Sequence, residues 1–134
     1  MAIDGKLYLA IGRDVVEYDI ERNQLVEVDD RGRPRPLVTT AEAGHIIGMA
    51  FDGSSLWLLT GREKLVHVEW STKTVMESYD VLPFGVSQAK GLGFGAGEFF
   101  VVDGNAPNLI HVLRLGTTAN KPWWRGGGPS LSCG

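Results

Sequence analysis

Seven polar residues stand where a loop meets an extended apolar run, which is where a binding or catalytic group would be accessible. They are His45, Arg13, Arg62, Glu63, Lys90, Asp103 and Asn105. An imidazole has an ordinary pKa of about 6.5, so His45 can transfer a proton or hydrogen-bond a ligand around neutral pH. Asp103 or Glu63 would assist it in acid–base chemistry. All of them except Glu63 are predicted to hold a polar ligand.

These residues also have a purely structural interpretation. His45 follows Gly44 and precedes an apolar run, so it can equally cap the entrance of a strand without a ligand. Arg13 and Arg62 each follow a glycine, which suits turn stabilisation as well as anion binding. Both interpretations stay open from the sequence alone.

Signatures of catalysis are missing from the sequence. It has no G-x-S-x-G elbow, no local cysteine and histidine motif, and no carboxylate pair at a spacing typical of acid–base work. Cys133 has no neighbouring cysteine or histidine, so there is no internal disulfide and no zinc pattern. The sequence therefore predicts no metal and no cofactor, and it favours a role other than catalysis.

A repeat organises the chain. The segment from Met1 to Gly5 (MAIDG) recurs from Met49 to Gly53 (MAFDG), and a third copy starts at Gly91. Gly12-Arg13 matches Gly61-Arg62, and His67 matches His111, for which we expect a structural role. Copies about 40 to 50 residues apart that contain several short strands are typical of propeller blades.

Each copy has the pattern of antiparallel strands joined by turns. In the second copy the pattern predicts strands at 46–51, 56–60, 64–70 and 74–81, with Asp52-Gly53 as a hairpin turn. Tyr8, Trp57 and Phe100 occupy equivalent second-strand positions, where we expect them to pack between sheets. No segment has the pattern of an amphipathic helix with caps; residues 39–43 allow one helical turn at most. The fold class predicted is all-β.

The segment from Gly48 to Leu58 (GMAFDGSSLWL), followed by Lys64 to Val68 (KLVHV), resembles repeats of the NHL, YVTN and streptogramin-lyase-like propellers. The resemblance implies four-stranded blades around a channel, with ligands on the face that carries the loops entering each inner strand. We expect blades at about 1–40, 44–84 and 88–117, and a separate tail at 118–134. Trp123 and Trp124 in that tail either add a final strand or cover an open edge.

Two classes of function are compatible with this resemblance. The first is a non-catalytic interaction module that holds a small polar ligand or a partner protein on the loop face. The alternative is a hydrolase or lyase of the streptogramin-lyase or lactonase type with His45 as general base. A truncated chain kept as a scaffold is a third possibility, because a propeller fold alone selects no function.

Three blades are too few to close a ring, since propellers need about four to eight. We therefore expect a homodimer in which two chains form a six-bladed ring. The competing expectations are that the tail folds over one open face, or that the chain closes as a small sandwich or barrel.

Composition restricts the other partners. The formal net charge is -3 and 22% of residues are charged, so the chain lacks the positive field that nucleic acid requires. The basic segment from Arg31 to Pro36 follows Asp29-Asp30, and we expect a solvated loop there. No apolar run reaches the roughly 20 residues of a membrane span, and no export signal is visible. We expect no specific nucleic acid, no membrane and a cytoplasmic location.

Overall fold

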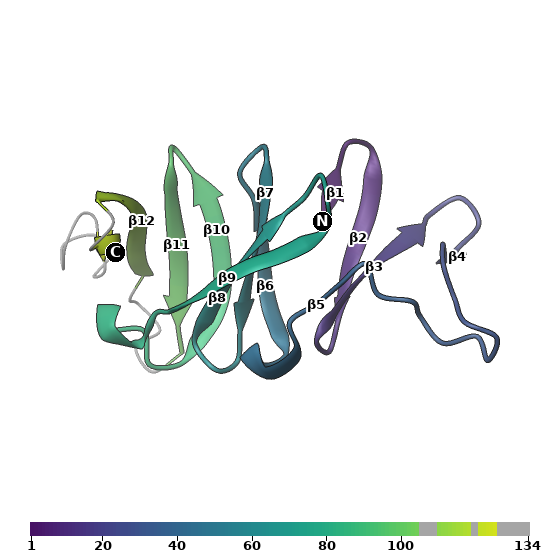
Figure 1. Ribbon diagram of the computed structural model, residues 1–134, viewed down its shortest axis with the longest axis horizontal. Coiled ribbons are helices and arrows are strands. Elements are labelled where there is room, and N and C mark those ends of the chain that lie inside the picture. The colour runs from purple at the N-terminus through teal and green to yellow at the C-terminus, as the bar shows by residue number, and fades with distance from the viewer. Residues whose placement is uncertain (105–109, 119–120, 126–134) are drawn as a thin grey trace.

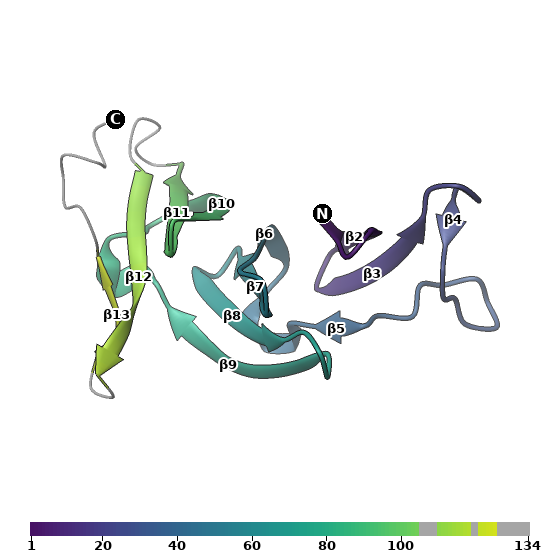
Figure 2. The ribbon, with the colours of Figure 1, turned by 90° about the horizontal axis from the view of Figure 1, so that it is seen from above.

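The chain forms three antiparallel sheets that stand side by side, each resembling one blade of a propeller (Figure 1). The computed structural model describes residues 1–104, 110–118 and 121–125, with side chains for residues 1–104 and 110–114. The inner strands lie next to one another, and the outer strands form the far edge of the stack (Figure 2).

The strands follow one another in space as they do in sequence. The first sheet contains β1 (Ala2–Ile3), β2 (Lys6–Ile11), β3 (Asp14–Asp19) and β4 (Gln24–Leu25), and β5 (Val38–Thr39) also pairs with β3. The second contains β6 (Ile46–Phe51), β7 (Ser55–Thr60), β8 (Lys64–Glu69) and β9 (Thr74–Asp80). The third contains β10 (Ala89–Gly95), β11 (Glu98–Asp103), β12 (Ile110–Thr118) and β13 (Lys121–Arg125). Short 3-10 turns, η1 (Ala41–Ala43) and η2 (Leu82–Phe84), precede β6 and β10.

The strands predicted for the second copy are confirmed to within one residue at each end. The expected helical turn at 39–43 corresponds to η1. Trp123 and Trp124 lie in β13, which pairs with β12 as a fourth strand, so the third sheet continues beyond the predicted repeat limit at 117.

Asp52 organises the hairpin between β6 and β7. Its Oδ1 accepts the backbone N–H groups of Ser54 and Ser55 at 2.9 and 2.7 Å, and its Oδ2 accepts the indole N–H of Trp57 at 2.9 Å. Burial opposes ionisation of this carboxyl, but these hydrogen bonds outweigh burial and hold the pKa of Asp52 below its ordinary value. Gly53 supplies the positive φ of 104° that the turn requires. The Asp52 carboxylate therefore holds the turn that the Asp52-Gly53 pair predicts.

Two apolar cores fill the spaces between consecutive sheets. Between the first and second sheets, the rings of Tyr8 and Trp70 meet edge to face with centroids 4.8 Å apart. Between the second and third, Trp57 meets Phe99 at 4.9 Å. The inner strands β6 and β10 approach so closely that a Cβ on Gly48 would lie 2.9 Å from the Cβ of Leu92.

The connection between β4 and β5 is an exposed loop, as predicted. Residues 31–36 are all exposed, and one isolated bridge joins Val28 to Pro34. Asp29 shapes the loop: its carboxylate accepts the backbone N–H groups of Arg31 and Arg33 and the Nε–H of Arg33, each at 2.9 Å. The arginine cluster is therefore partly neutralised by its own neighbour.

The prediction that three equivalent aromatic residues pack between sheets is right for two of them. Tyr8 and Trp57 are 6% and 3% exposed, whereas Phe100 is 36% exposed. Each lies on what we call the front face of its sheet, the face turned toward the following sheet. Phe100 is the exception, and its cross-strand partner Val112 on the same face is 2% exposed, so the front face of the third sheet is exposed only in part.

We predict that Trp57→Ala lowers the free energy of unfolding by about 3 to 5 kcal/mol, because it empties a buried aromatic site. Met76→Ala is the control, since Met76 is an exposed residue of β9 whose truncation should change stability by about 0.5 kcal/mol or less. Urea titration followed by circular dichroism measures both. Equal stability of the two variants would contradict the packing described for Trp57.

Candidate functional site: the loop end of the blades

The predicted site residues gather at one end of the sheets, which we call the loop end. It comprises the turns β2–β3, β7–β8 and β11–β12 and the segments that enter β6 and β10. Figure 1 shows the β2–β3 turn and η1 together at its lower edge. Asn105 belongs to this end by sequence but lies outside the described residues.

Hydrogen bonds connect the loop end across sheet boundaries. The N–H of Ile46 donates to the carbonyl of Gly12 at 2.8 Å, and the N–H of Thr40 donates to the carbonyl of Arg13 at 2.8 Å. Between the second and third sheets, the N–H of Ala89 donates to the Glu63 carboxylate at 3.3 Å. The loop end is therefore one continuous surface over three sheets.

Three of the candidate side chains lie directly against glycines. A Cβ on Gly61 would be 2.5 Å from the His45 ring, and one on Gly104 would be 2.7 Å from Cε of Lys90. The aliphatic stem of Arg62 lies over Gly44, and its Nη1 donates to the carbonyl of Glu42 at 3.3 Å. These glycines let long polar side chains lie flat on the backbone, which restricts their motion before any ligand arrives.

The cations of the loop end lack ion partners among the described residues, as do Lys6, Arg31, Arg35 and Lys73. Arg13, Arg62 and Lys90 are exposed, and no ion pair among the described residues includes them. Elsewhere on the described chain, Lys64 stands 3.6 Å from Asp80 and Arg114 stands 3.1 Å from Glu98. The charge of Arg13, Arg62 and Lys90 is therefore available to a ligand.

Asp103 is buried, unlike the exposed candidate residues of the loop end. It is 1% exposed, accepts the backbone N–H of Ser87 at 3.0 Å, and lies 3.1 Å from Nε2 of His111, which is also 1% exposed. This buried group ties the entrance of β10 to β11 and β12. The other ring nitrogen of His111 has no hydrogen-bond partner among the described residues. A ligand contact by Asp103 stays a prediction.

The structure does not join His45 to either candidate carboxylate. No hydrogen bond to a described residue involves the exposed His45 ring, while the carboxylate of Glu63 accepts from Ala89 and that of Asp103 faces His111. Glu63 has a positive φ of 56° and its carbonyl accepts the N–H of Val81, so it also shapes its turn. Catalysis by this set stays a prediction.

One polar network escaped the sequence analysis. His67 stacks on Trp57 at 4.5 Å, with Nε2 2.8 Å from the Ser55 hydroxyl and Nδ1 3.0 Å from the Glu77 carboxylate. Serine, histidine and carboxylate in this order resemble a nucleophile with its base and orienting acid. The cross-strand register, which pairs His67 with both Trp57 and Glu77, was the signal that could have revealed it.

The neighbourhood of this network opposes acyl transfer. The N–H of Ser55 already donates to Asp52, so it cannot stabilise an oxyanion. The Asp52 carboxylate beside it would repel the developing negative charge. We therefore assign the network to cross-linking β7, β8 and β9.

Hydrogen bonding within the network shifts two pKa values. The Tyr79 hydroxyl donates to Glu77 at 2.8 Å, and this bond, with the His67 contact, outweighs burial and lowers the pKa of Glu77. Burial, followed by the adjacent Glu77 carboxylate, raises the pKa of Tyr79 to about 12.

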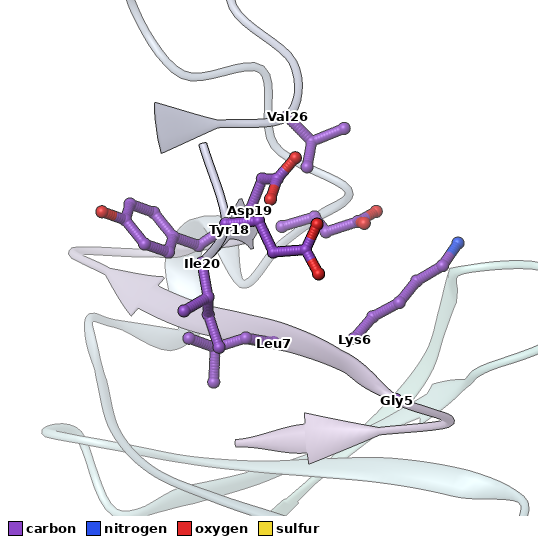
Figure 3. A pocket seen from close by; sticks show the side chains of 9 residues that line it. Gly5, Lys6, Leu7, Tyr18, Asp19, Ile20 and Val26 are labelled. Atoms are coloured by element: carbon purple, nitrogen blue, oxygen red, sulfur yellow. The ribbon is translucent and has the colours of Figure 1, made fainter. Parts of the chain in front are cut away.

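A cavity of about 400 Å³ lies away from the loop end, on the first sheet. Figure 3 shows Lys6 and Leu7 of β2 beside Asp19 of β3, with Val26 above them. The residues that line it are Gly5, Lys6, Leu7, Glu17, Tyr18, Asp19, Ile20, Glu21 and Val26. None of the predicted site residues is among them.

Comparison with known proteins shows the fold without a family. No protein-family model and no curated protein matches the chain. A chain of the Mitotic Checkpoint Complex superposes with a TM-score of 0.57 at 16% identity, covering 92% of this chain and 34% of that chain. The WD40 repeats of RRP9 superpose with a TM-score of 0.53 at 16% identity, covering 90% of this chain and 34% of that chain. The β-propeller domain of Cps50 (Swd1) from Myceliophteria thermophila superposes with a TM-score of 0.51 at 13% identity, covering 88% of this chain and 35% of that chain.

The chain spans about a third of the length of these solved structures. At such identities the likeness shows the fold, so the all-β class and the propeller-blade part of the resemblance are confirmed. Within the described residues, no helix has the length and apolar character needed to cross a membrane.

We predict that Glu77→Gln lowers the pKa of Tyr79 from about 12 toward its ordinary value of 10.0, leaving the part caused by burial. Since the raised pKa favours the neutral phenol in the folded protein, the stability from Tyr79 is complete below pH 10 and is lost as the pH rises toward 12. Titration of the Tyr79 ring resonances by NMR measures this, with Glu69→Gln as control. An unchanged pKa in Glu77→Gln would contradict the network.

Proposed function

We propose that this chain is a non-catalytic protein-interaction module, in which the open faces of the blades bind further blades and the loop end binds a ligand. The observation that carries this proposal is the exposure of Phe100 at a position where Tyr8 and Trp57 are buried. A face that is built like two covered faces, but leaves Phe100, Val102 and Ile110 partly exposed, favours an association surface.

The opposite, back face of the first sheet is also exposed in part, although Val16 on it is 1% exposed and the β4–β5 loop borders it at Pro34. Ile11, at the end of β2, is 46% exposed there. On the front face of the third sheet, Val102 and Ile110 accompany Phe100 at 40% and 37% exposure. Within the chain, every front face that has a following sheet is covered by the back face of that sheet. The occupant that best fits these two faces is therefore another blade.

A second copy of the chain supplies both missing faces at once. If the front face of the third blade of each chain packs on the back face of the first blade of its mate, six blades form a ring with two-fold symmetry. The contact is then apolar at its centre, as in a stable dimer interface. The homodimer is thus the assembly we propose.

On the loop end, we propose a small polar ligand or a segment of a partner protein, held by His45, Arg13, Arg62 and Lys90, with Asp103 and Asn105 as further candidates. The repeats of NHL, YVTN and streptogramin-lyase-like propellers, which the segment from Gly48 to Leu58 resembles, support this placement on the loop face. Membership of one of those groups, and the hydrolase or lyase alternative with His45 as general base, stay predictions. The isolation of the His45 ring from described carboxylates favours the binding role.

We predict that the chain is a dimer and that Phe100→Asp weakens the dimer by about tenfold to a hundredfold, because a carboxylate would be buried in an apolar interface. Sedimentation velocity over a concentration series measures the dissociation constant. Met76→Asp adds the same charge at an exposed position of β9 and should leave the dimer intact. A folded chain that stays monomeric at every concentration would overturn the dimer.

A further inference from the structure

We propose that the ligand of the loop end is an acidic, extended peptide segment of a partner protein, bound by Arg13, Arg62 and Lys90. The inference rests on the proposed function and adds the chemistry of the partner. It follows from the position, the free charge and the restrained geometry of these three cations.

The loop end carries one such cation on each sheet. Arg13 and Arg62 follow Gly12 and Gly61 in equivalent turns, but the third turn has Gly104 followed by Asn105. Lys90 lies over Gly104, so β10 brings a cation beside that glycine. The pattern of charge is thus repeated although the residues that make it differ.

The carboxylates of the loop end do not neutralise these cations. Glu63 accepts the N–H of Ala89, and Asp103 faces His111 in a buried site. Arg62 donates to the backbone carbonyl of Glu42, which leaves its charge uncompensated by a carboxylate. Guanidinium and ammonium groups in this state form strong charge-assisted hydrogen bonds with external carboxylates.

The arrangement suits an extended peptide better than a single compact anion. Sheets stacked face to face lie about 10 Å apart, and an extended chain of the polyproline II type advances about 3.1 Å per residue with three residues per turn. Acidic side chains at every third residue of such a chain lie on one side about 9 Å apart, so each could meet the cation of one blade. A lone phosphate would need the cations to converge on one point.

Close packing on glycine prepares the site for binding. The stems of Arg62 and Lys90 lie on Gly44 and Gly104, so fewer rotamers are lost when a ligand binds. The His45 ring on Gly61 adds a hydrogen-bonding group on the same surface.

The test is fluorescence anisotropy of the purified full chain with a labelled peptide that carries glutamate at every third residue. A matched peptide with glutamine at those positions is the comparison. We expect binding of the glutamate peptide that weakens with salt, little binding of the glutamine peptide, and a loss of about tenfold in Arg62→Glu and in Lys90→Glu. Lys6→Glu makes the same charge change at the opposite end of β2 and should keep full affinity.

A second variant tests geometry without changing charge. Gly104→Ala places a methyl group 2.7 Å from Oε1 of Gln88 and 2.9 Å from Cγ of Lys90, so the exposed Lys90 side chain has to leave its place on the backbone. We expect a several-fold loss of affinity with unchanged thermal stability. Equal binding of both peptides, or an equal loss in Lys6→Glu, would overturn the proposal. Competition by inorganic phosphate or a single-stranded oligonucleotide at equal concentration would also overturn it, in favour of a general anion site.

Sedimentation of the same samples separates this proposal from the homodimer. Charge variants of the loop end should keep the association state of the unaltered chain, while Phe100→Asp should change association and keep peptide affinity per chain. A monomer that binds the glutamate peptide would refute the dimer alone. A dimer indifferent to peptide charge would refute the acidic partner alone.

Discussion

The covering of each blade's front face by the back face of the next blade is the interaction on which the structure depends. A single four-stranded sheet has two faces, and the second sheet packs on a neighbour with both of them, so that every residue of its strand β7 is buried. The first and third sheets each obtain only one such contact within the chain. Because burial of apolar area provides most of the stabilisation, the central sheet holds the chain together and the outer faces remain available for association.

Polar groups fix the alignment of strands within the second and third sheets. His67, on the front face of the second sheet, links Ser55 to Glu77, while His111 on the back face of the third sheet faces Asp103. Buried polar groups cost free energy unless they find partners, so only one alignment of strands satisfies them. Apolar packing drives the sheets together, and these hydrogen bonds select the register.

The repeat made the strands of the second copy predictable, because Asp52-Gly53 and the alternating apolar residues are local signals that need no neighbour. The burial of Asp103 was not predictable in this way, since it depends on Ser87 and His111 reaching it from other segments. His67 and His111 match in sequence, yet His67 pairs with Trp57 whereas His111 pairs with Val101. A shift of one residue in pairing reverses the face of a strand, so residues that match in the repeat need not lie on the same face. The loop end was predicted as a location, but the support of its side chains by glycines was not.

Two different causes restrict the positions beneath the polar side chains to glycine. Gly44 has a φ of 107°, so its own backbone demands glycine whatever lies above it. Gly61 and Gly104 have no such φ, and only the His45 ring and the Lys90 stem exclude a larger residue there. Related sequences should therefore vary in pairs at 45 and 61 and at 90 and 104, with a bulkier residue at one position accompanying a smaller one at the other, while position 44 stays glycine independently.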